Sequence, residues 1–217
     1  MLDAGLKATL KKKYGDEQVL VVPYSSTAKI HDKFCVTTVK KIENILADRR
    51  FVLRADAEYN QAWVQPIPYI VVINKNANKV YVTNRIAGEE RLKDTLSLGA
   101  GGHINPVDTI GAINSWSVSL NAANRELNEE LSLRFIKGTD LEYVGTVRDF
   151  MSTTSEHLGI VYIAKVSSAK VKEKDNLCGS WMNFVDLVNN YHKFESWARH
   201  IIDHMLESGS SKEKIIF

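Results

Sequence analysis

The sequence predicts an α/β protein, an α/β/α sandwich with a mixed sheet and an N-terminal extension. Short apolar, β-branched runs and segments of helical spacing follow one another in mixed order. The 217 residues exceed a minimal domain but are few for two full ones, so we expect one core with additions. A hydrophobic content of 44% and a charged content of 25% are typical of a globular protein.

The first third of the chain, residues 1–66, is predicted to form an extension packed on the core. Helices are expected at residues 2–13 and 39–47, and short strands at residues 19–23 and 51–53. The segment Gln65-Pro66-Ile67-Pro68 predicts a stiff connection, because each proline pushes its predecessor to an extended conformation. We therefore place the start of the main domain at residue 67.

The main domain, residues 67–207, is predicted to contain both strands and helices, followed by a flexible tail at residues 208–217. A turn over residues 74–78 should join the first two strands. The expected elements are strands at 69–74, 79–83 and 95–98, a glycine turn at 99–102, a helix at 118–131, strands at 141–147 and 157–166, a polar loop at 167–176, and helices at 181–191 and 195–207.

Charge and cysteine usage exclude several classes of protein. A net charge of +2 is too small to indicate a nucleic-acid or membrane partner, and the basic run at residues 11–13 is assigned to a solvated helix face. Cys35 and Cys178 lack CxxC spacing, so a cysteine zinc site and a disulfide framework are not expected. Neither a signal-peptide core nor an apolar run of about 20 residues is present, and we expect a cytoplasmic protein.

One arginine and three glutamates occur within six residues of the helix expected at 118–131. Helical geometry places Glu126, Glu129 and Glu130 in one arc, and Arg125 one turn before Glu129. An apolar stripe lies beside them: Leu120, Ala123, Leu127 and Leu131. Like charges at this spacing destabilise a helix, whereas a hard divalent cation would remove the repulsion and attract phosphate. Taken alone, the segment is also compatible with a solvated acidic face.

Together with the glycines upstream, this segment resembles the Nudix box, G-x5-E-x7-R-E-U-x-E-E-x-G-U, where U is an aliphatic residue. Gly102 occupies the first position, and residues 125–130 occupy the central REUxEE core. Three departures are present: Asp108 replaces glutamate, Ser132 replaces glycine, and residues 109–117 form an insertion of nine residues. Loops tolerate such insertions.

The resemblance extends beyond the box to a bacterial subgroup of predicted Nudix phosphoesterases. Its similar segments are residues 65–69, 99–105, 157–162 and 195–197. This implies a Nudix-like α/β/α sandwich that covers nearly the whole chain. It also implies a metal-dependent hydrolase that cleaves a pyrophosphate bond in a nucleoside diphosphate linked to another moiety.

The resemblance further implies the residues of the site. Glu126, Glu129 and Glu130 would hold Mg²⁺ or Mn²⁺ near the backbone of Gly102, with Glu129 in closest contact. Arg125 would orient the glutamates, so Glu129, Glu126 and Arg125 form the expected catalytic set. A further carboxylate often completes such sites, and two candidates stay open: Glu156 and Glu173.

Substrate-binding residues are assigned from charge and position. Arg85, Arg91 and Lys93 flank the strand pair before the glycine turn and could bind phosphates, although surface solvation is the simpler role for any one of them. His103 follows the two glycines and could donate to phosphate, although a positioning hydrogen bond to the backbone is an equal alternative. His157 is expected to be structural. Four aromatic residues could stack on a base, although packing is their commoner role: Tyr69, Phe150, Trp181 and Trp197.

Two further functions are compared with hydrolysis. The departures at Asp108 and Ser132, with the insertion, would also suit a non-catalytic nucleotide-binding or regulatory module on a Nudix scaffold. An isoprenoid-diphosphate isomerase would need an active-site cysteine motif near the box, which is absent. The expected partner is a small nucleotide-type diphosphate, with no nucleic-acid polymer and no membrane, and a homodimer stays open.

Overall fold

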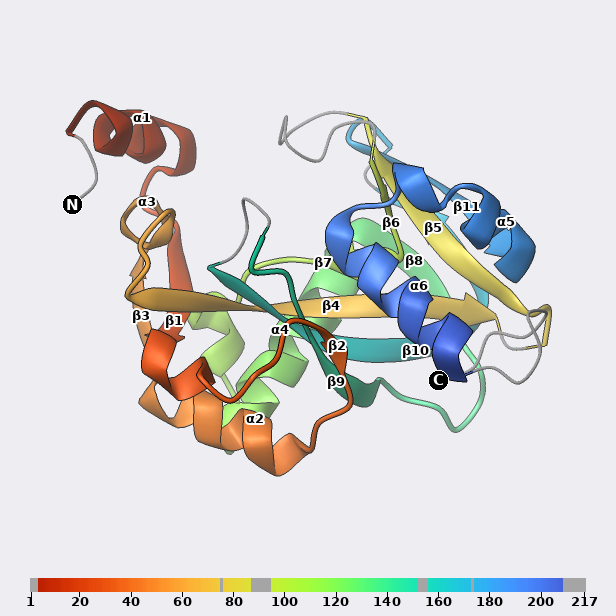
Figure 1. Cartoon of the computed structure of the whole chain (residues 1–217), viewed down its shortest axis with the longest axis horizontal. Helices are drawn as coiled ribbons and strands as arrows, with labels where there is room; N and C mark the ends of the chain where they lie inside the picture. The colour runs from red at the N-terminus through yellow and green to blue at the C-terminus, as the bar shows by residue number, and fades with distance from the viewer. Residues whose placement is uncertain (1–3, 75, 87–94, 152–155, 173, 209–217) are drawn as a thin grey trace.

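A mixed sheet forms the centre of the molecule (Figure 1). The computed structural model describes residues 4–74, 76–86, 95–151, 156–172 and 174–208. The main path of the sheet is β11 (Leu177–Asn183), β5 (Lys79–Arg85), β4 (Trp63–Asn74), β10 (His157–Val171), β9 (Glu142–Arg148) and β2 (Lys33–Cys35). The central strands β4 and β10 are parallel, and every other neighbouring pair on this path is antiparallel.

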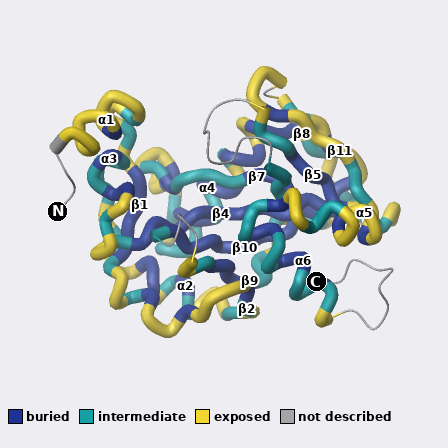
Figure 2. Tube along the Cα trace, turned by 45° about the horizontal axis from the view of Figure 1, so that its top comes forward, coloured by how far each residue is buried: buried dark blue, intermediate teal, exposed yellow. Residues whose placement is uncertain are grey.

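The two central strands bury both of their faces, and this explains their near-continuous apolar sequence. In β4, Ile70 and Val72 belong to one core, whereas Val71 and Ile73 belong to the other. Both strands are dark blue, and therefore buried, along much of their length in Figure 2. Alternation of side chains along a strand thus generates two cores from one pair of strands.

Helices cover each face of the sheet. The helices α4 (Ser115–Glu130) and α2 (Val39–Ile45) pack on one core, and α6 (Ser196–Ser208) and α5 (Phe184–Asn189) pack on the other. In Figure 1, α6 lies in front of β4 and α4 lies behind it. The predicted α/β/α sandwich with a mixed sheet is therefore confirmed.

The N-terminal segment contributes strands as well as helices. The helices α1 (Ala4–Tyr14) and α3 (Arg54–Ala57) lie together at one end of the molecule (Figure 1). The strand β1 (Gln18–Pro23) pairs with β3 (Arg50–Leu53) and with the start of β4. Since β4 runs without interruption through residue 66, the division into residues 1–66, 67–207 and 208–217 stays a proposal.

The expected connection at residues 65–68 is wrong, because these residues lie inside β4. Over this stretch β4 pairs with β10, whereas β1 pairs only up to Val64 and β7 (Gly99–Gly101) begins its pairing at Tyr69. Proline lacks an N–H donor, so a strand tolerates it where one of its edges makes no backbone hydrogen bonds to a neighbouring strand. Pro66 and Pro68 lie in the stretch of β4 between its pairing with β1 and its pairing with β7.

Three other predictions are corrected. The turn expected at residues 99–102 is strand β7 up to Gly101, because these residues pair with β4. The expected loop at residues 167–176 begins as strand, because β10 continues to Val171 and pairs there with β8 (Leu131–Phe135). The helix expected at 181–191 starts only at Phe184, after β11. Both β8 and β11 expose one face to solvent, so they lack the apolar run that marks β4.

The remaining elements are short. They are β6 (Leu96–Ser97) and the 3₁₀ turns η1 (Tyr24–Thr27), η2 (Leu46–Asp48), η4 (Pro106–Thr109) and η5 (Tyr191–Lys193). The predicted tail, apart from Ser208, lies outside the described residues. Within the described residues, no helix combines the length and the apolar character that crossing a bilayer requires.

Leu158 tests the dependence of the fold on β10. This side chain is fully buried in the core beneath α4. Leu158→Ala should lower the free energy of unfolding by about 2–5 kcal/mol, because it removes buried methyl groups and leaves a cavity. Urea unfolding followed by tryptophan fluorescence measures the loss. Leu6→Ala, on the exposed helix α1, is the matched control, and an equal loss in both variants would contradict this assignment of the core.

Candidate active site

A cavity of about 460 Å³ opens where α4, the glycine turn and the start of α6 meet. Glu126 and Glu130 line it from α4, and residues 99–102 line it from β7 and the residue that follows this strand. Trp197 lines it from α6. The N-terminal segment also reaches the cavity, through Glu17 and Arg54. The predicted box and the N-terminal segment therefore share one site.

Helix α4 is defined by a cap at its start and by a strand at its end. Asn114 caps the helix: its side chain accepts from the Ser117 N–H at 2.8 Å, and the Ser117 hydroxyl accepts from the Asn114 N–H at 3.0 Å. Leu131 is already extended, with φ −126° and ψ 146°, and the chain continues directly into β8. Ser132 therefore lies in a strand, where the conformational freedom of glycine is not needed.

The three glutamates do not share one environment. Glu126 and Glu130 are each about 9% exposed and line the cavity. The side chain of Glu129 is 52% exposed, is not among the residues that line the cavity, and binds Arg125 at 3.1 Å. Residues four apart lie nearly in line on a helix, whereas Glu129 is rotated by about 100° from Glu130. The expectation that Glu129 makes the closest metal contact stays a prediction.

Arg125 connects the helix to the loop that precedes it. Its Nε and Nη2 donate to the two carboxylate oxygens of the buried Asp108, at 2.9 and 3.0 Å. Nη1 donates to Glu126 at 2.8 Å and to Glu129 at 3.1 Å, and Nη2 also donates to the backbone oxygen of His103 at 2.8 Å. Burial lowers the pKa of Arg125, but the hydrogen bonds and charges of Asp108 and Glu126 outweigh burial and raise it. The shorter aspartate therefore still makes a bidentate pair with the arginine.

The insertion is tied to the helix that follows it. The Asn105 N–H donates to Asp108 at 2.8 Å across η4. The amide of Asn121 on α4 donates to the backbone oxygens of Asp108 and Ile110, at 3.0 and 3.3 Å. Gly111 adopts φ +72°, a conformation that glycine accommodates without strain. Residues 110–114 of the insertion thus lengthen the loop, and residues 115–117 form the first turn of α4.

Gly102 lies against the carboxylate of Glu126. A Cβ atom at position 102 would collide with the carboxyl carbon and both oxygens of Glu126. Glycine therefore brings the backbone beside a buried acid, as its lack of a side chain permits. Burial raises the pKa of Glu126, although the charge and hydrogen bond of Arg125 oppose this shift. Bringing a cation to this acid would relieve the cost of burying its charge.

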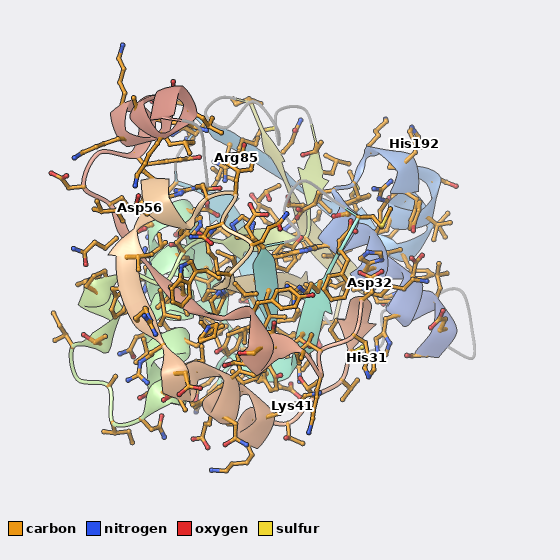
Figure 3. All side chains as sticks on the ribbon, turned by 60° about the vertical axis from the view of Figure 1, so that its left-hand side comes forward. His31, Asp32, Lys41, Asp56, Arg85 and His192 are labelled. Carbon is orange, nitrogen blue, oxygen red and sulfur yellow. The ribbon has the colours of Figure 1, made fainter. Side chains whose placement is uncertain are left out.

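Of the other predicted residues, some line the cavity and others lie elsewhere. Arg85 and His103 line it, and Nη2 of Arg85 lies 3.5 Å from Oε1 of Glu130. Figure 3 labels Arg85 on the side-chain view. Glu156 is half-buried at the start of β10 and is not among the lining residues. Three candidates, Arg91, Lys93 and Glu173, lie outside the described residues.

A carboxylate that sequence analysis missed lines the opposite side of the cavity. Glu195 precedes α6 and accepts a hydrogen bond from the Tyr69 hydroxyl at 2.7 Å. That hydroxyl also accepts from the Leu98 N–H at 3.0 Å, and burial, followed by the charge of Glu195, raises the pKa of Tyr69. The only sequence signal at Glu195 is its place beside Trp197 in the segment that resembles the subgroup.

Two of the four aromatic candidates line the cavity, and the other two do not. Tyr69 and Trp197 line the cavity and pack edge to face, with ring centroids 5.8 Å apart. Trp181 packs on Tyr81, and Phe150 packs on the guanidinium of Arg148. Both cysteines are free, and neither is among the residues that line the cavity.

Comparisons with known proteins agree with this geometry. No family model matches the chain. Protein YmaB from Bacillus subtilis (strain 168) is 30% identical over 206 residues, which cover 87% of this chain and 97% of YmaB. The crystal structure of Tm1382, which is assigned to the Nudix hydrolases, superposes with a TM-score of 0.74 at 26% identity, over 88% of this chain and 99% of Tm1382. The chain belongs to the Nudix hydrolase superfamily.

The Nudix fold is also shared with DR0079 from Deinococcus radiodurans, at a TM-score of 0.52 and 14% identity, over 80% of this chain and 98% of DR0079. Membership makes this chain a Nudix-type pyrophosphohydrolase, an enzyme that hydrolyses pyrophosphate bonds. The structure accommodates the three departures from the Nudix box, because Asp108 still pairs with Arg125, Ser132 lies in β8, and the insertion ends in the first turn of α4.

The raised pKa of Glu126 predicts how stability depends on pH. The folded protein binds this proton more tightly than the unfolded chain, so stability is greatest below the unfolded pKa and is lost as pH rises through the folded pKa. Glu126→Gln cannot ionise and still accepts from Arg125. In metal-free buffer it should be more stable than the wild type at neutral pH, with no difference in acid. Thermal unfolding across pH measures this, and the half-exposed Glu129→Gln should show no such gain.

Gly102→Ala tests the close approach of the glycine turn to Glu126. The added methyl group displaces the carboxylate, so we expect Mn²⁺ affinity to fall by at least about tenfold. The fold should persist, because Gly102 is not among the residues with positive φ. Calorimetric titration with Mn²⁺ measures the change, and Gly5→Ala in α1 serves as the control. Equal affinity in the two variants would refute the close approach.

Proposed function

We propose that this protein is a metal-dependent hydrolase that cleaves a pyrophosphate bond in a nucleoside diphosphate linked to another moiety. One observation carries the proposal: two buried carboxylates, Glu126 and Glu130, line a cavity of about 460 Å³ beside the backbone of Gly102. A cavity of this size is suited to a nucleotide-sized ligand. Each acid faces one guanidinium, Arg125 at Glu126 and Arg85 at Glu130, and a carboxylate keeps further lone pairs with which it would bind a cation.

The donor set suits a hard cation such as Mg²⁺ or Mn²⁺, which prefers oxygen ligands. In the proposal Glu126 and Glu130 hold the metal near Gly102, and Glu129 joins them from its half-exposed position. When bound, the metal would neutralise charge on the pyrophosphate and lower the pKa of a water molecule. Glu195 is favoured over Glu156 as the additional carboxylate, because only Glu195 of these two lines the cavity.

The protein's own residues position the acids and the substrate. Arg125, held by Asp108, fixes Oε1 of Glu126 at 2.8 Å, and we propose that Oε2 accepts a proton from the attacking water. Arg85 pairs with Glu130 and, in the proposal, turns its guanidinium to a substrate phosphate, which it can bind through two parallel hydrogen bonds. His103 lies at the same wall and is a second phosphate ligand in this proposal.

The partner is proposed to be a small nucleotide-type diphosphate. Tyr69 and Trp197 are the aromatic candidates that line the cavity, so they are the residues proposed to contact a base. A cytoplasmic location and a homodimer are kept as proposals.

A substrate screen with Mg²⁺ and with Mn²⁺ tests the activity. Dinucleotides, nucleotide sugars and nucleoside triphosphates are incubated with the full chain, and products are identified by mass spectrometry. Glu130→Gln should lower kcat/KM by at least about a hundredfold, because it removes a cavity-facing carboxylate worth several kcal/mol in the transition state. Glu129→Gln, one residue away and half exposed, should lose less.

Two results would contradict the proposal. The first is equal activity of wild type and folded Glu130→Gln on every substrate. The second is nucleotide-induced thermal stabilisation without hydrolysis in either metal, which is the behaviour of a non-catalytic binding module.

A further inference from the structure

A second group of metal-ligating side chains lies beside the proposed catalytic glutamates. Glu58 follows α3, His103 follows the glycine turn, and His157 is the first residue of β10. One carboxylate oxygen of Glu58 and one ring nitrogen of each histidine lie within 4.8 Å of one another. Glu58 and His157 are buried, at 7% and 5% exposure, and both histidines line the cavity.

The chemistry of this group differs from that of the Nudix glutamates. Two imidazoles and one carboxylate form the ligand set of many catalytic zinc sites, which keep a fourth position open. Imidazole nitrogen favours transition metals, whereas Mg²⁺ favours oxygen ligands. The nitrogen-rich group at His103 and His157 should therefore select a different cation from the oxygen-only group at Glu126 and Glu130.

The three side chains are held close to the required arrangement. Nε of Arg54 donates to Oε1 of Glu58 at 3.1 Å, and a carboxylate keeps capacity for a cation at its second oxygen. The rings of His103 and His157 pack edge to face, with centroids 5.6 Å apart. Tetrahedral coordination at about 2.1 Å places ligand atoms about 3.4 Å apart, so side-chain rotations would have to shorten the distances between the three atoms by at most about 1.4 Å.

The nearby charges favour a cation rather than oppose it. Arg54 is the positive group in contact with Glu58, and it is also paired with Glu17 at 3.2 Å. Two carboxylates and one guanidinium leave this corner of the cavity with one negative charge. Arg54 therefore orients Glu58 without neutralising the corner, which is the role that hydrogen-bonded neighbours commonly play around metal ligands.

We propose that Glu58, His103 and His157 form a second cation site that binds a transition-metal ion such as Zn²⁺, with an open position toward the cavity. None of its ligands is a Nudix glutamate, so the site can bind a cation whether or not the proposed hydrolysis occurs, and His103 would then act as a metal ligand rather than contact phosphate directly. His103 directly follows Gly102, so the two sites are neighbours in one cavity. A phosphate of a bound ligand could then contact the ions of both sites.

Cobalt titration of the full chain in a large excess of Mg²⁺ tests the proposal. Mg²⁺ fills the oxygen-ligand site, and Co²⁺ bound tetrahedrally by imidazole gives strong visible absorption. We expect one equivalent of Co²⁺ to produce this band and one equivalent of Zn²⁺ to remove it. Glu58→Gln and His103→Asn should each weaken Co²⁺ binding by more than about tenfold. His192→Asn, an exposed histidine at the periphery, is the matched control (Figure 3).

Circular dichroism establishes that each variant is folded before titration. Glu58→Gln is the decisive variant if a histidine variant does not fold, because glutamine can still accept from Arg54. Unchanged Co²⁺ affinity in folded Glu58→Gln would overturn the proposal. Complete displacement of Co²⁺ by Mg²⁺, or an equal loss of affinity in His192→Asn, would also overturn it.

Discussion

The bidentate pair between Arg125 and Asp108 is the interaction on which the site depends. It joins helix α4 to the loop that follows the glycine turn, although the two residues are 17 positions apart. The same guanidinium binds Glu126, Glu129 and the backbone oxygen of His103, so one side chain sets the position of two acids and of the loop. Such a fork cannot be replaced by lysine, whose ammonium lacks the planar geometry.

The N-terminal segment supports this arrangement from the other side of the loop. The Leu20 N–H donates to the backbone oxygen of Ile104, and the side chain of Asn105 donates to the backbone oxygen of Gln18, both at 2.8 Å. Glu17 and Arg54 also form part of the cavity wall. The first third of the chain therefore contributes to the candidate site, whether or not it forms a separate domain.

Sequence patterns predicted those parts of the structure that depend on residues close to one another in the chain. The helical period of the sequence predicts the apolar stripe of α4. Of the three acids in the REUxEE core, Glu126 and Glu130 line the cavity and Glu129 does not. In contrast, β8 was missed because it has only five residues and follows a helix directly, and Pro66 and Pro68 concealed the centre of β4. Glu195 could not be placed, since its position depends on the hydroxyl of Tyr69, 126 residues away in the chain. The sequence could not predict that Glu129 is more exposed than Glu126, because this difference depends on how α4 packs against the loop that contains Asp108.

The parallel pairing of β4 with β10 also has a consequence for biosynthesis. His157 pairs with Gln65 across about ninety residues of intervening chain, and such distant contacts form slowly because loop closure costs entropy before pairing returns any stability. The cavity receives residues from β5, α4, β10 and the start of α6. Synthesis must therefore pass Trp197 before the complete cavity can form, and the nascent chain exposes unpaired apolar strands until then.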